Sequence, residues 1–222
     1  MRIELQSTAD GSPTLFLPDI DEHYHSVKGA LSESQHVYID LCWKEWVVGN
    51  VGKEIKVFEV GFGTGLNAAL TAINAVDNKV PTIYYSIELH PIDHAISEEL
   101  EKAFTKELAK ELYLVNRAEW NKEVEINPYF TLIKIQGDFL KMEFPRGLNA
   151  IYFDAFAPEK QPEMWNPEVI QRLYDNIVSG GILTTYCAKG QIRRMLAGIG
   201  FVPERLSGPP GGKREVLRCR KK

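Results

Sequence analysis

Short apolar runs alternate with stretches of helical periodicity through most of this chain. The runs cover residues 56–60, 82–87, 130–136, 150–153 and 182–186, and helical patterns occupy residues 66–73, 168–178 and 191–199. Buried strands that alternate with helices are typical of a parallel sheet. Two further runs, 201–204 and 215–220, flank a Gly- and Pro-rich turn. The pattern therefore predicts an α/β fold whose mostly parallel sheet ends in an antiparallel hairpin.

Two segments depart from this alternation. Residues 1–50 precede the first strand and contain a hairpin pattern over 5–16 and a helical pattern over 37–48. We expect an N-terminal extension or cap there, with the main domain over residues 51–222. Residues 92–126 are charged, mostly helical in pattern and too long for one crossover helix. They predict a helical insertion near 92–127 within a chain long enough for one domain with an elaboration.

The first strand ends in a tight turn of alternating glycines. Glu59 precedes Gly61, Gly63 and Gly65, and a helix begins directly afterwards. Glycine lets the backbone turn sharply and lets a ligand lie against amides that carry no side chain. The spacing differs from the G-x-G-x-x-G of dinucleotide-binding folds. By itself, the turn also fits an ordinary connection between a strand and a helix.

Acidic residues follow the next three strands. In a parallel sheet the carboxyl ends of the strands face the ligand crevice. Glu88 lies 23 residues after Gly65, near the separation of about 20 at which an acidic side chain binds ribose hydroxyls. Asp138 is placed to accept from an adenine amino group while Phe139 packs on the ring, although a turn aspartate is a common alternative. Asp154 is followed by the apolar surfaces of Phe156 and Pro158.

Composition restricts the class of protein. The sequence has no apolar stretch long enough to span a membrane, and its first residues lack a secretory signal pattern. Three scattered cysteines favour a reducing cytoplasmic location over disulfides or structural zinc. The pairs His23/His25 and His90/His94 have no acidic or cysteine partner at a ligand interval, so we expect no metal.

The charge is distributed unevenly along the chain. Residues 1–188 contain 16 Lys and Arg against 28 Asp and Glu, whereas residues 189–222 contain 10 against 2. A basic segment on an acidic body is typical of a protein that binds a polyanion. A solubilising terminus explains the charge equally well.

Three stretches, in this order, make the pattern specific: residues 61–67 (GFGTGLN), 154–165 (DAFAPEKQPEMW) and 212–217 (GKREVL). With residues 10–12 and 22–26, they resemble the methyltransferase domain of the MnmC family over nearly the whole chain. The resemblance implies a Rossmann-like class I fold that uses S-adenosyl-L-methionine (SAM). The implied reaction is N-methylation of the 5-aminomethyl group of 5-aminomethyl-2-thiouridine at the tRNA wobble position.

The long form of that family has a second, FAD-dependent oxidoreductase domain. This sequence ends at Lys222, so we expect it to resemble the stand-alone, MnmD-like form. Whether a separate enzyme supplies the aminomethyl precursor stays open, as does the oligomeric state.

The resemblance also implies residue roles. The predicted cofactor-binding residues are Glu59, Gly61, Gly63, Gly65, Asn67, Glu88, Asp138 and Phe139. Asp154 is the predicted catalytic residue, which orients the amine and accepts its proton if it acts as a base as well. The predicted substrate-binding residues are Tyr24, Phe156 and Pro158, with Trp165 as a further aromatic candidate. Lys213 and Arg214, together with Arg218, are predicted to contact phosphates of the anticodon stem-loop.

Three other functions fit parts of the pattern. An aminopropyltransferase of the spermidine synthase type has a similar sheet, but its aspartate-rich motifs are not matched. A nicotinamide-dependent oxidoreductase needs the third glycine one place later and a Tyr-x-x-x-Lys or further domain. A non-catalytic binding module would not need both the polar and the apolar residues that follow the fourth strand.

Overall fold

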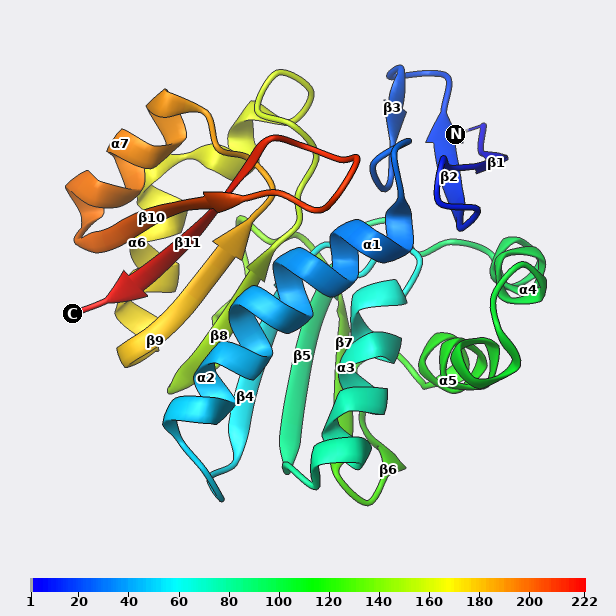
Figure 1. Cartoon of the computed structure of the whole chain (residues 1–222), viewed down its shortest axis with the longest axis horizontal. Coiled ribbons are helices and arrows are strands. Elements are labelled where there is room, and N and C mark those ends of the chain that lie inside the picture. Colours follow the sequence, from blue (N-terminus) through cyan, green and yellow to red (C-terminus); the bar gives the residue numbers. More distant parts are fainter. Residues whose placement is uncertain (1) are drawn as a thin grey trace.

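The strands of the computed structural model, which describes residues 2–222, fall into two sheets (Figure 1). The small sheet has three antiparallel strands: β1 (Glu4–Ser7), β2 (Pro13–Leu17) and β3 (Glu22–His23). The large sheet has the strand order β10-β11-β9-β8-β4-β5-β7-β6. Its strands are β4 (Ile55–Val60), β5 (Thr82–Glu88), β6 (Glu123–Asn127), β7 (Phe130–Gln136), β8 (Leu148–Phe153), β9 (Ile177–Thr185), β10 (Phe201–Ser207) and β11 (Glu215–Lys221).

The five central strands of the large sheet, from β9 through β8, β4 and β5 to β7, are parallel to one another. Strand β11 lies antiparallel beside β9, and β10 pairs with β11 to form the outer edge. The predicted mostly parallel sheet with a terminal antiparallel hairpin is therefore confirmed. The order reverses at β4, so the crevice beyond the ends of β4 and β8 is a topological switch point where such sheets bind ligands.

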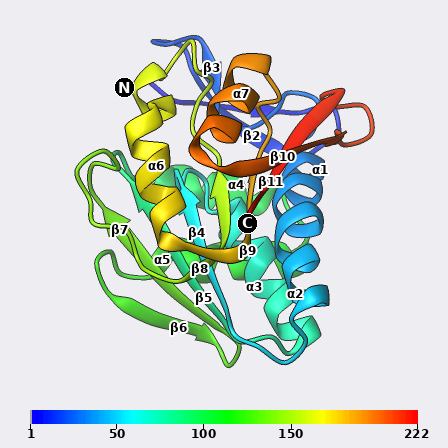
Figure 2. The same cartoon turned by 90° about the vertical axis from the view of Figure 1, so that its left-hand side faces the viewer.

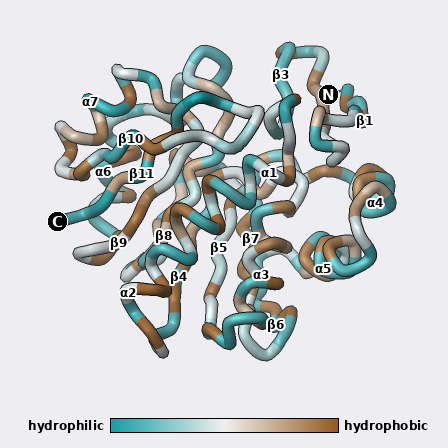
Figure 3. Tube along the Cα trace, in the orientation of Figure 1, coloured by the Kyte–Doolittle hydropathy of each residue, from teal (hydrophilic) through white to brown (hydrophobic). Residues whose placement is uncertain are grey.

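Helices cover both faces of the large sheet (Figure 2). One face carries α1 (Ala30–Ser34), α2 (Glu45–Gly49), α3 (Leu66–Asn78) and, nearer the β6 edge, α5 (Lys106–Arg117). The other face carries α6 (Pro167–Asn176) and α7 (Gly190–Ile199). Adjacent strand residues point to opposite faces: Val57 packs in the core under α3 and α5, and Phe58 packs in the core under α6 and α7. Figure 3 shows the resulting hydrophobic stretches along β4 and β9 and the alternating hydropathy along α1 and α2.

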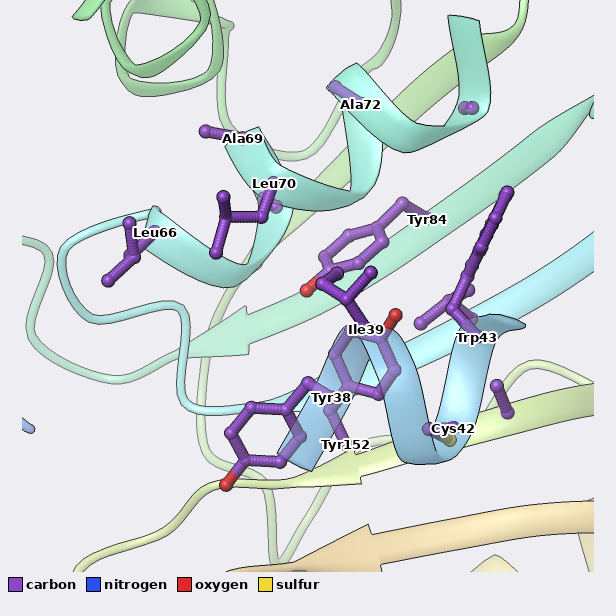
Figure 4. Close-up of a cluster of buried hydrophobic side chains, with 14 of the residues drawn as sticks. Tyr38, Ile39, Cys42, Trp43, Leu66, Ala69, Leu70, Ala72, Tyr84 and Tyr152 are labelled. Carbon is purple, nitrogen blue, oxygen red and sulfur yellow. The ribbon is translucent and has the colours of Figure 1, made fainter. Parts of the chain in front are cut away.

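A ten-residue π-helix, Gln35–Lys44, joins α1 to α2 in one continuous helix across the sheet. It contributes Tyr38, Ile39, Cys42 and Trp43 to a fully buried cluster with Tyr84 and Tyr152 (Figure 4). The Tyr38 and Tyr152 rings are 5.2 Å apart between centroids. Wider π-type turns occur often at functional sites, and this one places the Tyr38 hydroxyl near the end of β8.

The predicted hairpin over residues 5–16 is present as β1 and β2, and its turn caps α1. The Ser12 hydroxyl accepts the N–H groups of Ala30 and Leu31, and the Asp10 carboxylate accepts the N–H of Ser32. These N–H groups lie in the first turn of a helix and have no partner within it. The Asp10-Gly11-Ser12 stretch therefore joins the small sheet to the long helix.

The insertion predicted near residues 92–127 contains α4 (His94–Lys102) and α5, but its last five residues are not helical. They form β6, antiparallel to β7 at the edge of the large sheet. The helical prediction was wrong there because strand pairing with β7 overrides local charge and propensity at a sheet edge. Among residues 2–222, the helices lack the combination of length and apolarity needed to cross a membrane.

Candidate active site

Two cavities meet at the carboxyl ends of β4 and β8. The first cavity, of about 290 Å³, lies between the glycine turn, the end of β5 and the segment after β7. Nine of the predicted site residues line it: Tyr24, Gly61, Gly63, Asn67, Glu88, Asp138, Phe139, Asp154 and Phe156. The second cavity, of about 610 Å³, lies between residues 22–27, the segments after β8 and β9, and the β10–β11 loop. Pro158, Lys213 and Arg214 line the second cavity.

Glu88 is fixed by the backbone around it. Its Oε2 atom accepts the N–H of Gly63 at 3.1 Å, and its Oε1 atom accepts the N–H of His90 at 2.9 Å. The end of β5 and the glycine turn are thus linked by a carboxylate that lines the first cavity. An amide that already donates to Glu88 is not available to a pyrophosphate, and this argues against a dinucleotide.

The glycine turn is shaped by positive φ angles and close neighbours. Gly61, Gly63 and Gly65 have φ values of 88°, 52° and 80°, a region that side chains disfavour. A Cβ on Gly63 would lie 3.1 Å from the Tyr24 ring, so glycine allows the N-terminal segment to pack on the turn. Gly65 lines neither cavity; a Cβ there would lie 3.0 Å from the Phe62 ring. Its role is to pack the start of α3.

Glu59 does not reach either cavity, which contradicts its predicted contact with the cofactor. Its side chain is fully buried beneath the turn, where it accepts a hydrogen bond from the Ser86 hydroxyl at 2.7 Å. Burial raises the pKa of Glu59 to about 8. The acidic residue before the glycines therefore belongs to the core under the site.

Asp138 and Phe139 line the rim of the first cavity. The Asp138 carboxylate accepts the N–H of Leu140 and pairs with Lys141 at 3.0 Å, and these contacts lower its pKa. It is therefore both a turn aspartate and a cavity residue. Phe139 is 4% exposed and packs among core rings, including Phe144 at 5.3 Å, so only a small part of it is open to the first cavity.

Asp154 stands where the two cavities meet and lines both. The Tyr38 hydroxyl donates to its Oδ1 atom at 2.6 Å, and the Asn67 amide donates to its Oδ2 atom at 2.9 Å. These two bonds favour the ionised form, whereas burial, the largest effect, and the nearby Glu33 carboxylate favour the neutral form. Together they raise the pKa of Asp154 to about 7, which suits a group that exchanges a proton near neutral pH.

Tyr24 and Phe156 form the wall beside Asp154. Their rings meet edge to face, 5.5 Å apart, and both line both cavities. His25 holds the Tyr24 segment against the glycine turn through a 2.8 Å hydrogen bond between its Nε2 and the Thr64 hydroxyl. Burial lowers the pKa of His25 to about 4, so this imidazole is neutral at neutral pH. The histidine is a tether between the small sheet and the turn.

Charge distinguishes the two cavities. The residues that line the first cavity include four carboxylates, Glu88, Asp138, Asp154 and Glu163, and none of its lining residues is Lys or Arg. The second cavity has both signs, with three basic residues, Lys189, Lys213 and Arg214. A cationic ligand therefore fits the first cavity, and a ligand that carries both an amine and phosphates fits the second.

A family model described as S-adenosyl-L-methionine-dependent methyltransferase matches residues 96–222, which is more than half of the chain. This chain belongs to that methyltransferase family. The prediction of a SAM-dependent methyltransferase is confirmed, and the match favours methyl transfer over aminopropyl or hydride transfer.

Curated relatives extend the similarity to the N-terminal part. The chain is 32% identical over 218 residues to the "tRNA 5-methylaminomethyl-2-thiouridine biosynthesis bifunctional protein MnmC" of Pseudomonas syringae pv. syringae, with 90% of this chain covered. It is 31% identical over 223 residues to the protein of the same name from Cupriavidus necator, with 93% covered. The predicted resemblance to the MnmC methyltransferase domain is thus confirmed. The chain spans about a third (32%) of the length of these relatives.

Two solved structures show the same fold. MNMC2 from Aquifex aeolicus superposes with a TM-score of 0.83 at 24% identity and covers all of this chain and 71% of its own. Spermidine synthase from Thermotoga maritima superposes with a TM-score of 0.57 at 14% identity and covers all of this chain and 69% of its own. These likenesses establish the class I fold of the methyltransferase.

The first cavity fits the cofactor of the family. SAM has a sulfonium, an ammonium and a carboxylate group, with a net positive charge, and the acidic lining of this cavity suits the two cationic groups. Glu88 is oriented by two backbone N–H groups and projects to the end of β5, where a carboxylate binds ribose hydroxyls. The residues that would hold the cofactor are Gly61, Gly63, Asn67, Glu88 and Asp138.

Two sequence predictions about substrate contacts were wrong. Trp165 is 6% exposed, donates its indole N–H to the Phe156 carbonyl at 2.9 Å and packs on Phe153, so it supports the wall and offers no stacking face. The Arg218 side chain is 13% exposed and is paired with Glu204 and Glu45, so it is not available to phosphate. Five of the ten Lys and Arg in residues 189–222 are paired with carboxylates, including Arg205 with Glu215 and Arg220 with Glu45.

Several site residues gave no recognisable signal in the sequence. Tyr38, Glu33 and Tyr186 lie outside the stretches that carry the family resemblance, and His25, within residues 22–26, was assigned no role in the site. The fold brings all four to the site. For Glu33 and Tyr38, the sequence supported only the expectation of an N-terminal extension or cap over residues 1–50.

Proposed function

We propose that this methyltransferase transfers the methyl group of SAM to the primary amine of 5-aminomethyl-2-thiouridine at the wobble position of tRNA, in the cytoplasm. Asp154 carries the proposal, because its carboxylate stands between a cavity suited to SAM and a second cavity open to a larger substrate. The names of the MnmC relatives support the choice of tRNA and of this modified uridine. This chain spans only about a third of those relatives, so the choice of substrate for this chain is part of the proposal.

Asp154 prepares the amine. A primary aliphatic amine is protonated in water, and only its neutral form has the lone pair that attacks carbon. When bound, SAM supplies a methyl group on a sulfonium sulfur that departs as a neutral thioether. With a pKa of about 7, the Asp154 carboxylate accepts a hydrogen bond from the amine, orients it and takes its surplus proton. That proton then leaves through the second cavity, so each turnover releases one proton.

The aromatic wall holds the base and excludes water. Tyr24 and Phe156 line both cavities, as Asp154 does. Sequence-specific RNA recognition uses unstacked bases that are splayed out and stacked on aromatic side chains. The wobble uridine enters the second cavity in this way, with its aminomethyl group directed at Asp154 and Pro158 among the groups that line its path.

Phosphate contacts come from basic groups that the protein does not already neutralise. Within residues 2–222, Arg193, Arg194 and Arg214 form no ion pair. Arg214 lines the second cavity, and Arg193 and Arg194 lie on α7 beyond it. We assign these three arginines to the anticodon stem-loop backbone, which gives affinity without sequence readout.

Methyl transfer from radiolabelled SAM into bulk tRNA tests the proposal. The tRNA is taken from cells that lack this activity, and its nucleosides are identified by mass after digestion. We expect new 5-methylaminomethyl-2-thiouridine at the expense of the aminomethyl precursor, and no label in matched tRNA from cells with the activity. Absence of label in both tRNA pools, with SAM binding intact, would reject this acceptor and leave the family assignment in place.

A further inference from the structure

The primary ammonium group of Lys213, one of two lysines that line the second cavity, already has partners there. The Lys213 Nζ atom is 2.9 Å from Glu33 Oε1 and 3.7 Å from the centroid of the Tyr186 ring. All three residues line the second cavity, together with Asp154. A carboxylate and an aromatic face are two groups with which proteins bind an ammonium ion. The arrangement is therefore a formed ammonium site occupied by a side chain.

The carboxylate of this site is fixed in place. The whole of Glu33 is 6% exposed, and its Oε2 atom accepts the N–H of Ser26 at 3.1 Å. The ring is fixed too, because the Tyr186 hydroxyl donates to the Ala155 carbonyl at 2.9 Å, next to Asp154. A buried carboxylate without a counter-ion is costly, so a cation beside Glu33 stabilises its ionised form.

The Lys213 side chain, by contrast, is partly exposed to solvent. The Lys213 side chain is 40% exposed, against 9% for the Glu33 side chain. Lys213 lies in the loop between β10 and β11, which reaches across to α1 (Figure 1). The base of that loop is attached to the long helix through a 2.8 Å hydrogen bond between His36 Nε2 and the Ser207 carbonyl. The lysine can exchange its carboxylate for water while Glu33 and Tyr186 stay in position.

We propose that Glu33 and Tyr186 form the subsite that binds the acceptor's ammonium group, and that Lys213 fills this subsite until the acceptor displaces it. The inference rests on the proposed function, because it assumes a primary amine as acceptor. The arriving ammonium replaces the lysine as counter-ion of Glu33 and is then within the cavity that Asp154 lines. Lys213 therefore competes with the acceptor's amine, in contrast to the phosphate contact that the sequence predicts.

Equilibrium binding of a nucleoside separates these two roles of Lys213. The probe is 5-aminomethyluridine, which has the amine and no phosphate, and the control ligand is 5-hydroxymethyluridine, which has no charge. Calorimetric titrations compare the wild type with Lys213→Met and Glu33→Gln, each checked by thermal unfolding. Lys213→Gln is the second variant if Lys213→Met does not fold.

We expect 5-aminomethyluridine to bind Lys213→Met about tenfold more tightly than the wild type, since a competing charge is lost, which corresponds to about 1.4 kcal/mol. We expect Glu33→Gln to bind it at least about tenfold more weakly, as for loss of a charge-assisted hydrogen bond. The hydroxymethyl control should bind all three proteins equally. Unchanged or weaker binding of the amine by Lys213→Met would overturn the inference.

The binding test does not depend on methyl transfer. If tRNA is not methylated but the amine shows the expected pattern, the proposed tRNA acceptor is wrong and the ammonium subsite stands for another amine. If tRNA is methylated but Lys213→Met loses affinity for the amine, the proposed function stands and the subsite is rejected.

Discussion

The two cavities are built from different kinds of sequence. The first is lined mainly by residues at the ends of consecutive strands and in one glycine turn, all within residues 61–164 apart from Tyr24 and His25. The second joins residues 22–33 to residues 186–215 across the C-terminal hairpin. Its central ion pair, between Glu33 and Lys213, spans 180 positions. The strand ends and glycine turn of the common fold thus form most of the first cavity, and the N-terminal and C-terminal segments form most of the second.

Asp154, which belongs to both cavities, gives the largest expected effect. Asp154→Ala should lower kcat about 10²- to 10⁴-fold, the usual range for a positioned acid–base group. SAM affinity should stay near the wild-type value, because Glu88 and the glycine turn are untouched. Single-turnover methyl transfer and calorimetric SAM binding measure the two quantities. Loss of SAM affinity with a near-normal rate at saturating SAM would show that Asp154 belongs to the first cavity alone.

Glu88 gives the next effect and tests the first cavity alone. Glu88→Ala removes the carboxylate that accepts from Gly63 and His90. SAM affinity should fall about 10- to 100-fold, as for loss of charged hydrogen bonds, while kcat at saturating SAM stays close to the wild type. Asp138→Ala, on the rim of the same cavity, is the matched comparison and should have a smaller effect. A Glu88→Ala enzyme with unchanged SAM affinity would contradict the assignment of this cavity to the cofactor.

A substitution of Tyr38 tests what controls the pKa of Asp154. The Tyr38 hydroxyl stabilises the ionised form of Asp154, so Tyr38→Phe should raise the pKa of that carboxyl further. The acidic limb of the kcat/KM profile should move to higher pH by about one unit. Activity would then fall at pH 7 and recover near pH 9.

Tyr152→Phe is the matched control for this shift. The Tyr152 ring packs against the Tyr38 ring, but its hydroxyl is directed to Thr71 at 3.3 Å and not to Asp154. The acidic limb should stay in place. Equal shifts in both variants would show that the hydrogen bond from Tyr38 does not control the protonation of Asp154.

The basic residues give the smallest expected effect. Arg214→Gln should weaken tRNA binding by about three- to tenfold and reduce its salt dependence by about one phosphate contact. Arg218→Gln should leave tRNA affinity unchanged, because Glu204 and Glu45 already hold that guanidinium, and should lower thermal stability instead. Filter binding over a salt series measures both. A larger loss in Arg218→Gln than in Arg214→Gln would reverse this assignment.

The sequence predicted the fold well because buried parallel strands are marked by local apolar runs. The strand over 82–87 and the strand over 130–136 were placed within one residue at each end. Strand β6 was missed, since its charged residues face solvent at the sheet edge and only pairing with β7 makes it a strand. Pairing between distant segments leaves no trace in local periodicity.

The candidate site divides in the same way. Glu88 and Asp154 were found because each directly follows an apolar run, so their place in the crevice is a local property. Tyr38 was not found, since it lies 116 positions from the Asp154 that it contacts. The net charge of residues 189–222 could not show which of its basic groups are free, because the acidic partners of Lys189, Lys213 and Arg220 lie outside this segment.

A crystal structure of the chain with S-adenosylhomocysteine, the product of methyl transfer, tests the central claim most directly. We expect the ribose at Glu88, the adenine near Asp138 and Phe139, and the sulfur beside Asp154, facing the second cavity across Tyr24 and Phe156. A ligand whose sulfur points away from Asp154, or which lies outside the first cavity, would contradict the account.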